Sequence, residues 1–160
     1  MTEQHEKFCS LIKEYRPGLF RVAKGILKND MDAEDAVSET TCKAFANLHK
    51  LRAFDSFKPW VMKILINEAY GIARKRKKTE PLVDMSDESD HSDMLESLEL
   101  WDAVKLLGVE FRTVTILFYY EDMSIKEISK ILNLPQGTVN SRLKRSREKL
   151  KTILTSKEVT

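Results

Sequence analysis

The sequence lacks the features of membrane, secreted or disulfide-stabilised proteins. No apolar run approaches the roughly 18 residues that a membrane-spanning helix needs. Residues 1–10 are polar and charged, which argues against a secretory signal. Cys9 and Cys42 have neither CxxC spacing nor a Cys/His cluster around them, so we expect a reducing environment without a disulfide framework or a metal site. These absences favour a cytoplasmic protein that needs no metal and no other cofactor.

Signatures of catalysis are also missing. There is no Gly-rich phosphate loop, no HExxH pair and no nucleophile elbow. Neighbouring acids such as Glu34 and Asp35 would point in different directions on a helix. No strand pattern of useful length occurs, whereas apolar residues recur at helical spacing along most of the chain. We therefore predict an all-α protein that is not an enzyme and has no small-molecule substrate.

Charge is distributed in blocks rather than evenly. The 160 residues carry a net charge of only +2, and their hydrophobic fraction of 42% is sufficient for one domain or two small ones. Residues 29–42 contain five acids and no base, and residues 80–102 contain nine acids and no base. Between them, residues 74–78 form the uninterrupted basic run RKRKK. Such blocks indicate several charged partners of different kinds.

Residues 123–150 are typical of two helices that meet at a sharp turn. Ser124 and Glu127 have the spacing of a capping box, Asn133 can adopt the left-handed conformation that ends a helix, and Pro135 suits the first position of the next helix. The second helix is rich in cations: Arg142, Lys144, Arg145, Arg147, Lys149 and Lys151. This pattern predicts a DNA-binding helix-turn-helix, whose second helix enters the major groove. An ordinary helix pair with a solvated basic face is the alternative.

The N-terminal half is predicted to be helical on both sides of a turn at residues 29–32. Apolar residues share one helical face before Pro17 and form another face after Pro17 and Gly18, and a further helix follows the turn. Its inward positions are expected to be Ala36, Val37, Thr40, Ala44, Phe45 and Leu48. Acidic residues gather at the N-terminus of this helix, where the helix dipole favours carboxylates. They form either a dipole-stabilised helix start or a docking surface for a basic partner.

Residues 51–59 are predicted to be a loop, followed by a long helix over residues 60–78 with a basic end. The aromatic residues Phe54, Phe57 and Trp60 next to a basic helix suit a nucleic-acid strand whose bases are unstacked. Core packing is the alternative for each of them. Residues 79–93 are polar and acidic without apolar periodicity, so we expect a flexible acidic linker. It would join two small helical domains, at residues 1–78 and 94–160, the second containing the helix-turn-helix.

Three segments together resemble the bacterial RNA polymerase sigma factors of the extracytoplasmic-function class (group IV, sigma-70 family). DAEDAVSETTCKAF is similar to their D-x-E-D-x-V-Q-E-T-F-x-K-A-[WF] segment, and FKPWVMKILINEAYGIARKRKK is similar to the segment that follows it. MSIKEISKILNLPQGTVNSRLKRSREKL resembles their C-terminal helix-turn-helix, with its G-T-V-x-S-R-L-x-R-A-R pattern. The resemblance covers residues 8–78 and 95–150. Departures are Ser38 for Gln, Thr41 with Cys42 for an apolar pair, Asn133 for Gly and Ser146 for Ala.

The resemblance implies a region 2-like domain (1–78), a region 4-like domain (94–160) and a role for each surface. Docking on core RNA polymerase would involve Asp32, Glu34, Asp35 and Glu39. Recognition and melting of the −10 element would involve Leu51, Arg52, Phe54, Phe57, Trp60, Asn67, Arg74, Lys75 and Arg76. Recognition of the −35 element would involve Thr138, Asn140, Ser141, Arg142, Lys144, Arg145 and Arg147. Within this last set, Asn140, Ser141, Lys144 and Arg145 are expected at base edges. Arg142 and Arg147 are better placed for phosphates or packing.

The resemblance also implies the partners of the chain. They are core RNA polymerase, promoter DNA and an anti-sigma factor, often membrane-anchored, which would release the chain on an envelope or stress signal. Free of partners, the chain is expected to be a monomer. The linker is either a solvated tether or a nucleic-acid mimic on a basic polymerase surface. We expect residues 94–160 alone to bind DNA weakly, because the polymerase supplies avidity by fixing both ends of the chain.

Two other functions remain open at this point. One is a helix-turn-helix regulator that binds an operator as a dimer and never replaces a sigma factor. The other is an anti-sigma-like or adaptor protein without DNA contact. A regulator would need a dimerisation or ligand domain in place of the acidic helix and the aromatic-basic segment, so the N-terminal half favours the sigma factor.

Overall fold

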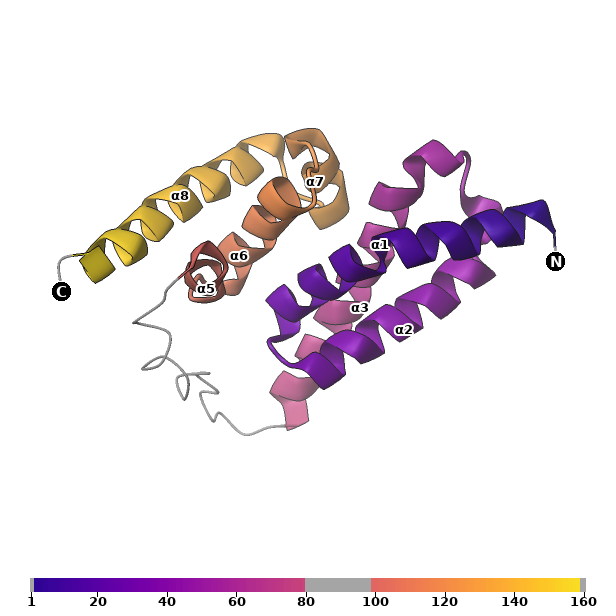
Figure 1. Cartoon of the computed structure of the whole chain (residues 1–160), viewed down its shortest axis with the longest axis horizontal. Coiled ribbons are helices and arrows are strands. Elements are labelled where there is room, and N and C mark those ends of the chain that lie inside the picture. Colours follow the sequence, from indigo (N-terminus) through magenta and orange to yellow (C-terminus); the bar gives the residue numbers. More distant parts are fainter. Residues whose placement is uncertain (1, 80–98, 159–160) are drawn as a thin grey trace.

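The computed structural model describes residues 2–79 and 99–158, and within these ranges every regular element is helical. The N-terminal bundle consists of α1 (Glu3–Leu27), α2 (Asp30–Ala46), η1 (Leu48–Lys50), η2 (Phe54–Ser56) and α3 (Phe57–Thr79). The C-terminal bundle consists of α5 (Leu100–Lys105), α6 (Val109–Thr115), η4 (Ile116–Tyr120), α7 (Ile125–Leu132) and α8 (Gln136–Glu158) (Figure 1). The predicted all-α class with two helical domains is confirmed. Nearly all of the predicted acidic linker lies outside the described residues.

The N-terminal bundle is held by a short turn between α1 and α2 and by an aromatic core. Lys28 has φ 60°, and the Asn29 side chain accepts a hydrogen bond of 3.0 Å from the Asp32 N–H, so the turn ends one helix and caps the next. Phe57 is fully buried, with its ring centroid 5.8 Å from Phe8 and 6.0 Å from Tyr15.

None of the helices in the two described ranges has the length and apolar character needed to cross a bilayer.

Three details of this bundle differ from the sequence-based expectation. Helix α1 runs through Pro17 without interruption, and Pro17 borders an open groove. Helix α3 begins at Phe57, three residues before the predicted start, because Pro59 is tolerated in a first turn where N–H groups have no intrahelical acceptor. Phe45 was expected to point inward, but it is 48% exposed and packs edgewise on Phe8, with its ring centroid 5.0 Å from that of His5.

The helix-turn-helix forms as predicted. The Glu127 N–H donates to Ser124 Oγ over 3.1 Å, while the Ser124 N–H donates to Glu127 Oε1 over 3.0 Å. Asn133 adopts the left-handed conformation with φ 56° and ψ 48°, at the end of α7. Helix α8 starts at Gln136, one residue later than expected, and the Pro135 carbonyl accepts from the Val139 N–H. The capping chemistry thus sets the angle at which α8 leaves the domain.

The helix that precedes the helix-turn-helix ends in an unusual turn. Residues 116–120 are wound as a π-helix, with the Glu121 N–H bonded to the Ile116 carbonyl over 3.0 Å. Asp122 follows with φ 55°. Such π turns are rare and shift the direction of the residues that follow them.

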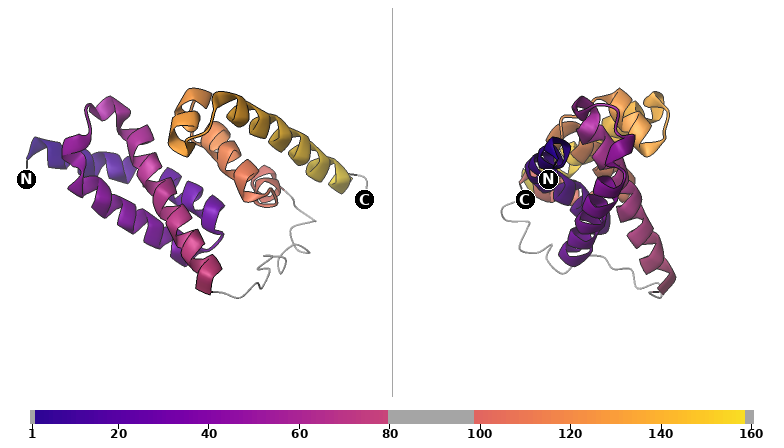
Figure 2. Two further views of the ribbon diagram at one scale, coloured as in Figure 1. Left: turned by 180° about the vertical axis from the view of Figure 1, so that it is seen from behind. Right: turned by 90° about the vertical axis from the view of Figure 1, so that its right-hand side faces the viewer.

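The two bundles pack against each other. Figures 1 and 2 show α6 and η4 alongside the C-terminal half of α1, and α7 also contacts α3.

We predict that Ser124→Ala weakens the C-terminal domain by about 1 kcal/mol, because the first turn of α7 then loses the side-chain acceptor of its capping box. Urea denaturation of the full chain, followed by circular dichroism, measures the change. Thr152→Ala is the matched control, since that hydroxyl only donates to a carbonyl within exposed α8. Equal midpoints for the two variants would contradict the capping role.

Candidate nucleic-acid and protein interfaces

Helix α8 presents a row of polar and basic side chains to solvent. Val139 and Leu143 anchor the helix in the core of the domain. On the opposite side, the exposed residues are Asn140, Ser141, Lys144, Arg145 and Arg147, with Thr138 and Arg142 half-buried. Thr138, Ser141 and Arg145 line one open groove of about 580 Å³ at the start of α8. Two of the four residues predicted to reach base edges, Ser141 and Arg145, thus lie in one groove near the N-terminal end of the helix, the end that a recognition helix inserts into the major groove.

Several cations of α8 have partners within their own domain. Arg142 forms an ion pair of 3.7 Å with Glu110, and Arg147 donates a hydrogen bond of 3.1 Å to the Tyr119 hydroxyl. The Lys149 Nζ lies 5.2 Å from the centroid of the Phe111 ring. These contacts suit side chains that pack or meet phosphates, whereas Lys144 and Arg145 extend from the open face.

Ser146 is a positioning residue that sequence reasoning recorded only as a departure from the family pattern. Its side chain is completely buried. The hydroxyl lies 2.7 Å from the Arg142 carbonyl and 3.2 Å from the Phe111 carbonyl, so it ties α8 to α6. The local sequence gave no signal for this contact, because the acceptor on α6 is 35 residues away.

The four acids predicted on α2 separate into two groups. Glu34, Asp35 and Glu39 are exposed. Asp32 is only 6% exposed, and its two carboxylate oxygens face Arg76 on α3, with a hydrogen bond of 2.8 Å from Nη2 and an ion pair to Nε. This two-pronged pair joins the start of α2 to the basic end of α3. The pair therefore joins a residue predicted to bind polymerase, Asp32, to a residue predicted to bind DNA, Arg76.

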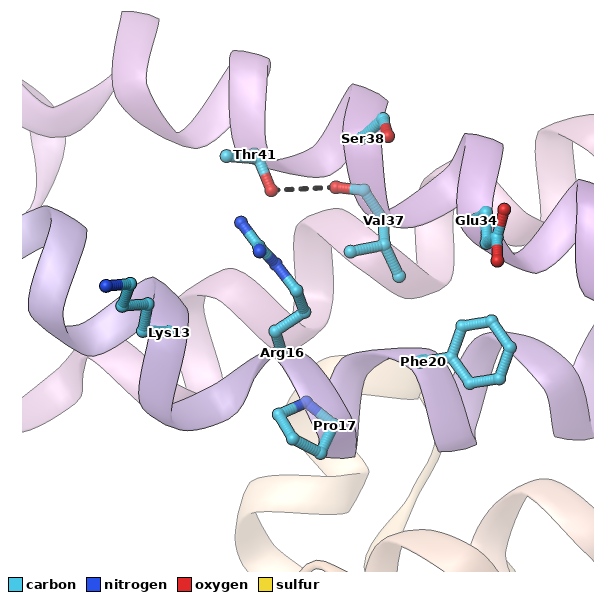
Figure 3. Close-up of a pocket in the computed structure, with 8 residues that line it drawn as sticks. All are labelled: Lys13, Arg16, Pro17, Phe20, Glu34, Val37, Ser38 and Thr41. Carbon is cyan, nitrogen blue, oxygen red and sulfur yellow. Dashed lines mark hydrogen bonds between the residues drawn. The ribbon is translucent and has the colours of Figure 1, made fainter.

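An open groove of about 780 Å³ runs between α1 and α2, next to the exposed acids (Figure 3). Its walls are Lys13, Arg16, Pro17 and Phe20 from α1 and Glu34, Val37, Ser38 and Thr41 from α2. The Thr41 hydroxyl donates to the Val37 carbonyl over 2.8 Å. Ser38 and Thr41, two departures from the family pattern, thus shape this groove. Sequence reasoning missed the α1 wall, because Lys13 and Arg16 stand in an otherwise ordinary amphipathic stretch.

The residues predicted to meet the −10 element are only partly brought together. Trp60 and Asn67 share an open groove of about 440 Å³ with Lys43, Asn47, Lys50, Ile64 and Glu68. Arg52, Arg74 and Lys75 are exposed, while Leu51 and Phe54 are half-buried. Phe57 lies in the core with no exposed surface, so core packing holds for this aromatic and a direct contact with DNA is incompatible with its position.

The groove around Trp60 and Asn67 also contains two cations, Lys43 and Lys50, that the sequence analysis did not predict as site residues. Lys43 pairs with Glu68 across α2 and α3, and the hydrogen bond and charge of Glu68 raise the pKa of Lys43 above its ordinary value. Lys50 supplies a second cation from η1. A groove with an indole, an amide and cations has the chemistry that binds an unstacked base next to its phosphate.

Comparison with known proteins agrees with the resemblance seen in the sequence. The family description Sigma-70 region 2 matches residues 11–79, and Sigma-70, region 4 matches residues 97–150. The ECF RNA polymerase sigma factor SigW of Bacillus subtilis (strain 168) is 30% identical over 164 residues, covering 91% of this chain and 88% of its own. The chain belongs to the ECF RNA polymerase sigma factors. RNA polymerase sigma factor SigV of the same strain is 29% identical, covering 92% of this chain and 91% of its own.

Two solved structures share the fold of this ECF sigma factor. The sigma factor RpoE in complex with the anti-sigma factor NepR from Bartonella quintana has a TM-score of 0.76 at 24% identity, covering 94% of this chain and 98% of that chain. CnrH in complex with the cytosolic domain of CnrY has a TM-score of 0.70 at 22% identity, covering 95% and 90%. Family membership assigns the chain to transcription initiation by RNA polymerase.

We predict that Asp32→Ala lowers the free energy of unfolding by about 1–2 kcal/mol, because it leaves a buried site without its carboxylate and removes one of the ion pairs that join α2 to α3. Denaturant titration of the purified chain measures this. Asp35→Ala, which removes an exposed acid of the same helix, serves as the control and should stay within about 0.5 kcal/mol of the parent. A loss of stability shared by both variants would show that the pair with Arg76 is not the cause.

Proposed function

We propose that this ECF sigma factor reads promoters with two surfaces and binds core polymerase with a third. The surfaces are the exposed face of α8 for the −35 element, the groove around Trp60 and Asn67 for the −10 element, and the acidic face of α2 for the polymerase. The observation that carries the proposal is the presence, in one chain, of an exposed recognition helix and a separate cationic groove that contains an aromatic side chain. An enzymatic activity forms no part of it.

The deciding experiment is reconstitution. The purified chain is mixed with core RNA polymerase, the complex is isolated by gel filtration, and run-off transcription is measured on promoters selected with that complex. We expect a stable complex and initiation at defined start sites. A chain that binds DNA but neither joins core polymerase nor supports initiation would be a helix-turn-helix regulator instead.

We predict that Arg145→Ala lowers promoter affinity of the reconstituted complex by about 5- to 150-fold, the range that corresponds to losing one good base contact. Arg145 is chosen because it is exposed at the groove formed by the start of α8. Lys151→Ala removes an exposed cation from the same helix outside this groove and should have a much smaller effect. An unchanged affinity of Arg145→Ala would remove this residue from the reading surface and would favour an adaptor without DNA contact.

We predict that the triple variant Glu34→Ala, Asp35→Ala, Glu39→Ala weakens binding to core polymerase at least tenfold, because exposed carboxylates of α2 would lose a complementary basic partner. Fluorescence anisotropy of the labelled chain, titrated with core polymerase, measures the dissociation constant. A salt dependence that is reduced in the variant would identify the loss as electrostatic. Retained affinity would place the docking surface elsewhere.

We further propose that an anti-sigma factor regulates the chain. The support is the fold shared with the sigma factor RpoE, whose solved structure contains the anti-sigma factor NepR. The chain itself would act in the cytoplasm, and a membrane-anchored partner would hold it at the membrane until a signal arrives. Fractionation of cells tests this: the chain should move from the membrane fraction to the soluble fraction on induction. A distribution that is equal before and after every inducing condition would contradict membrane sequestration.

A further inference from the structure

Glu68 is the only acid among the described residues that line the groove around Trp60 and Asn67, which we call the −10 groove. The side chain of Glu68 is 19% exposed, so its carboxylate is largely enclosed but still accessible from the groove. An acid is unexpected at a surface that meets a nucleic-acid strand, because its charge repels phosphates. Glu68 therefore needs a role that outweighs this repulsion.

Helix α3 brings Glu68 to the same side as the indole of Trp60. Trp60, Ile64, Asn67 and Glu68 all line the −10 groove, and their spacing along α3 places them on one face of the helix. Side chains of an α-helix lean toward its N-terminus, which directs Glu68 back toward Trp60, about two turns earlier. A base that stacks on the indole would therefore present its edge toward the Asn67 amide and the Glu68 carboxylate.

Lys43 neutralises the Glu68 carboxylate at the wall of the groove. The Lys43 ammonium group, which comes from α2, forms an ion pair with Glu68 and donates a hydrogen bond to its Oε1. Lys50 of η1 supplies a further cation, which is exposed. The residues that line the groove therefore keep a net positive charge in spite of the acid. A phosphate of the strand can meet Lys50 while the carboxylate stays in place.

The carboxylate of Glu68 accepts hydrogen bonds and cannot donate them. Cytosine and adenine each offer an amino group to such an acceptor, and guanine offers an amino group next to a ring N–H. Thymine has no amino group, and the carbonyl oxygens beside its ring N–H would face the carboxylate with charge of the same sign. In a single strand, the base edges that are otherwise used for pairing are free to be read. Glu68 therefore favours the edge of an amino-bearing base.

We propose that Glu68 is a specificity-determining residue: its carboxylate accepts a hydrogen bond from the amino group of the base held in the −10 groove and excludes thymine there. The proposal rests on the promoter-reading function proposed above. The indole of Trp60 supplies a stacking surface that every base can use, so the choice among bases depends on the polar groups. A pair that only joined α2 to α3 would make stability, and not the choice of base, depend on Glu68.

Selection by the reconstituted complex tests the exclusion of thymine. Core polymerase carrying the parent chain or Glu68→Gln transcribes a pool of promoters randomised across the −10 element, and the transcribed templates are sequenced. With the parent, we expect thymine to be depleted at one position on the order of tenfold, the effect of one base contact. The glutamine amide can also donate to a carbonyl oxygen, so Glu68→Gln should remove this depletion at that position alone. A parent that tolerates thymine at every position, or a depletion that Glu68→Gln leaves unchanged, would overturn the proposal.

Lys43→Met is the matched control, because it breaks the same ion pair and keeps the carboxylate. It should lower the affinity for all templates, since a cation is lost from the groove, and it should keep the depletion of thymine. Urea denaturation should give similar midpoints for Lys43→Met and Glu68→Gln, because each variant removes one partner of the pair. A loss of base preference in both variants would assign the effect to the ion pair and would overturn the role of the carboxylate.

Binding of short single strands tests the groove without polymerase. The chain contains two tryptophans, so Trp101→Phe isolates the fluorescence of Trp60 and retains an aromatic ring beside Tyr120. A base that stacks on the indole should quench this fluorescence. Strands of deoxycytidine should bind the parent on the order of tenfold more tightly than strands of deoxythymidine, and both should bind Glu68→Gln equally. Equal binding of the two strands by the parent, or no quenching with either, would overturn the proposal.

The two measurements separate a failure of the role of Glu68 from a failure of the proposed function. If the complex initiates transcription but Glu68→Gln leaves the base preference unchanged, the chain reads promoters and Glu68 takes no part in the choice of base. If the single strands are discriminated as expected but no complex supports initiation, the promoter-reading function fails while the base preference of the groove stands.

Discussion

Helix α1 is the element on which both halves of the molecule depend, because its sides are used for different purposes. One side buries Phe8, Leu19 and Val22 against α2 and α3. A second side carries Gly18 and Gly25 and meets α6 and η4. A third side, with Lys13 and Arg16, borders the open groove beside α2. A single amphipathic stripe would serve only the first purpose, so the glycines of α1 reflect its second interface, the one with the C-terminal bundle.

Ion pairs inside the molecule determine which charges remain available to partners. Asp32 with Arg76 and Lys43 with Glu68 both join α2 to α3, while Arg21 with Glu121 joins the two domains. The pair of Asp32 with Arg76 removes one charge from the acidic block at residues 29–42 and one from the basic run at residues 74–78. Glu34, Asp35 and Glu39 on α2, and Lys144 and Arg145 on α8, stay exposed. These two blocks are therefore smaller as binding surfaces than they are as stretches of sequence.

Local chemistry in the sequence was sufficient for the helices and their caps, and insufficient for contacts between distant segments. The Ser124 capping box and the left-handed Asn133 depend on residues within one turn, so their spacing predicted them. The burial of Phe57 and the pairing of Asp32 depend on tertiary contacts. Acids that stabilise a helix start and acids that bind a partner have the same pattern in a sequence. Only the position of Arg76 in the structure distinguishes the paired Asp32 from the exposed acids next to it. The continuity of α1 through Pro17 also depends on tertiary contacts, because packing by α2 and α3 can outweigh one lost backbone hydrogen bond.

The contact between the two bundles depends on side chains that are absent as much as on those that are present. A Cβ at Gly18 would overlap the Glu121 carboxylate, and a Cβ at Gly25 would overlap Ile116 Cδ1, so the C-terminal bundle approaches α1 at two positions where only glycine fits without a shift. Arg21 of α1 pairs with Glu121, and the Arg112 guanidinium donates to the Gly25 carbonyl, so each bundle supplies charged partners to the other. These partners are 87 to 100 residues apart in the sequence. The spacing of residues within one helix therefore predicts the two bundles and leaves the contact between them unpredicted.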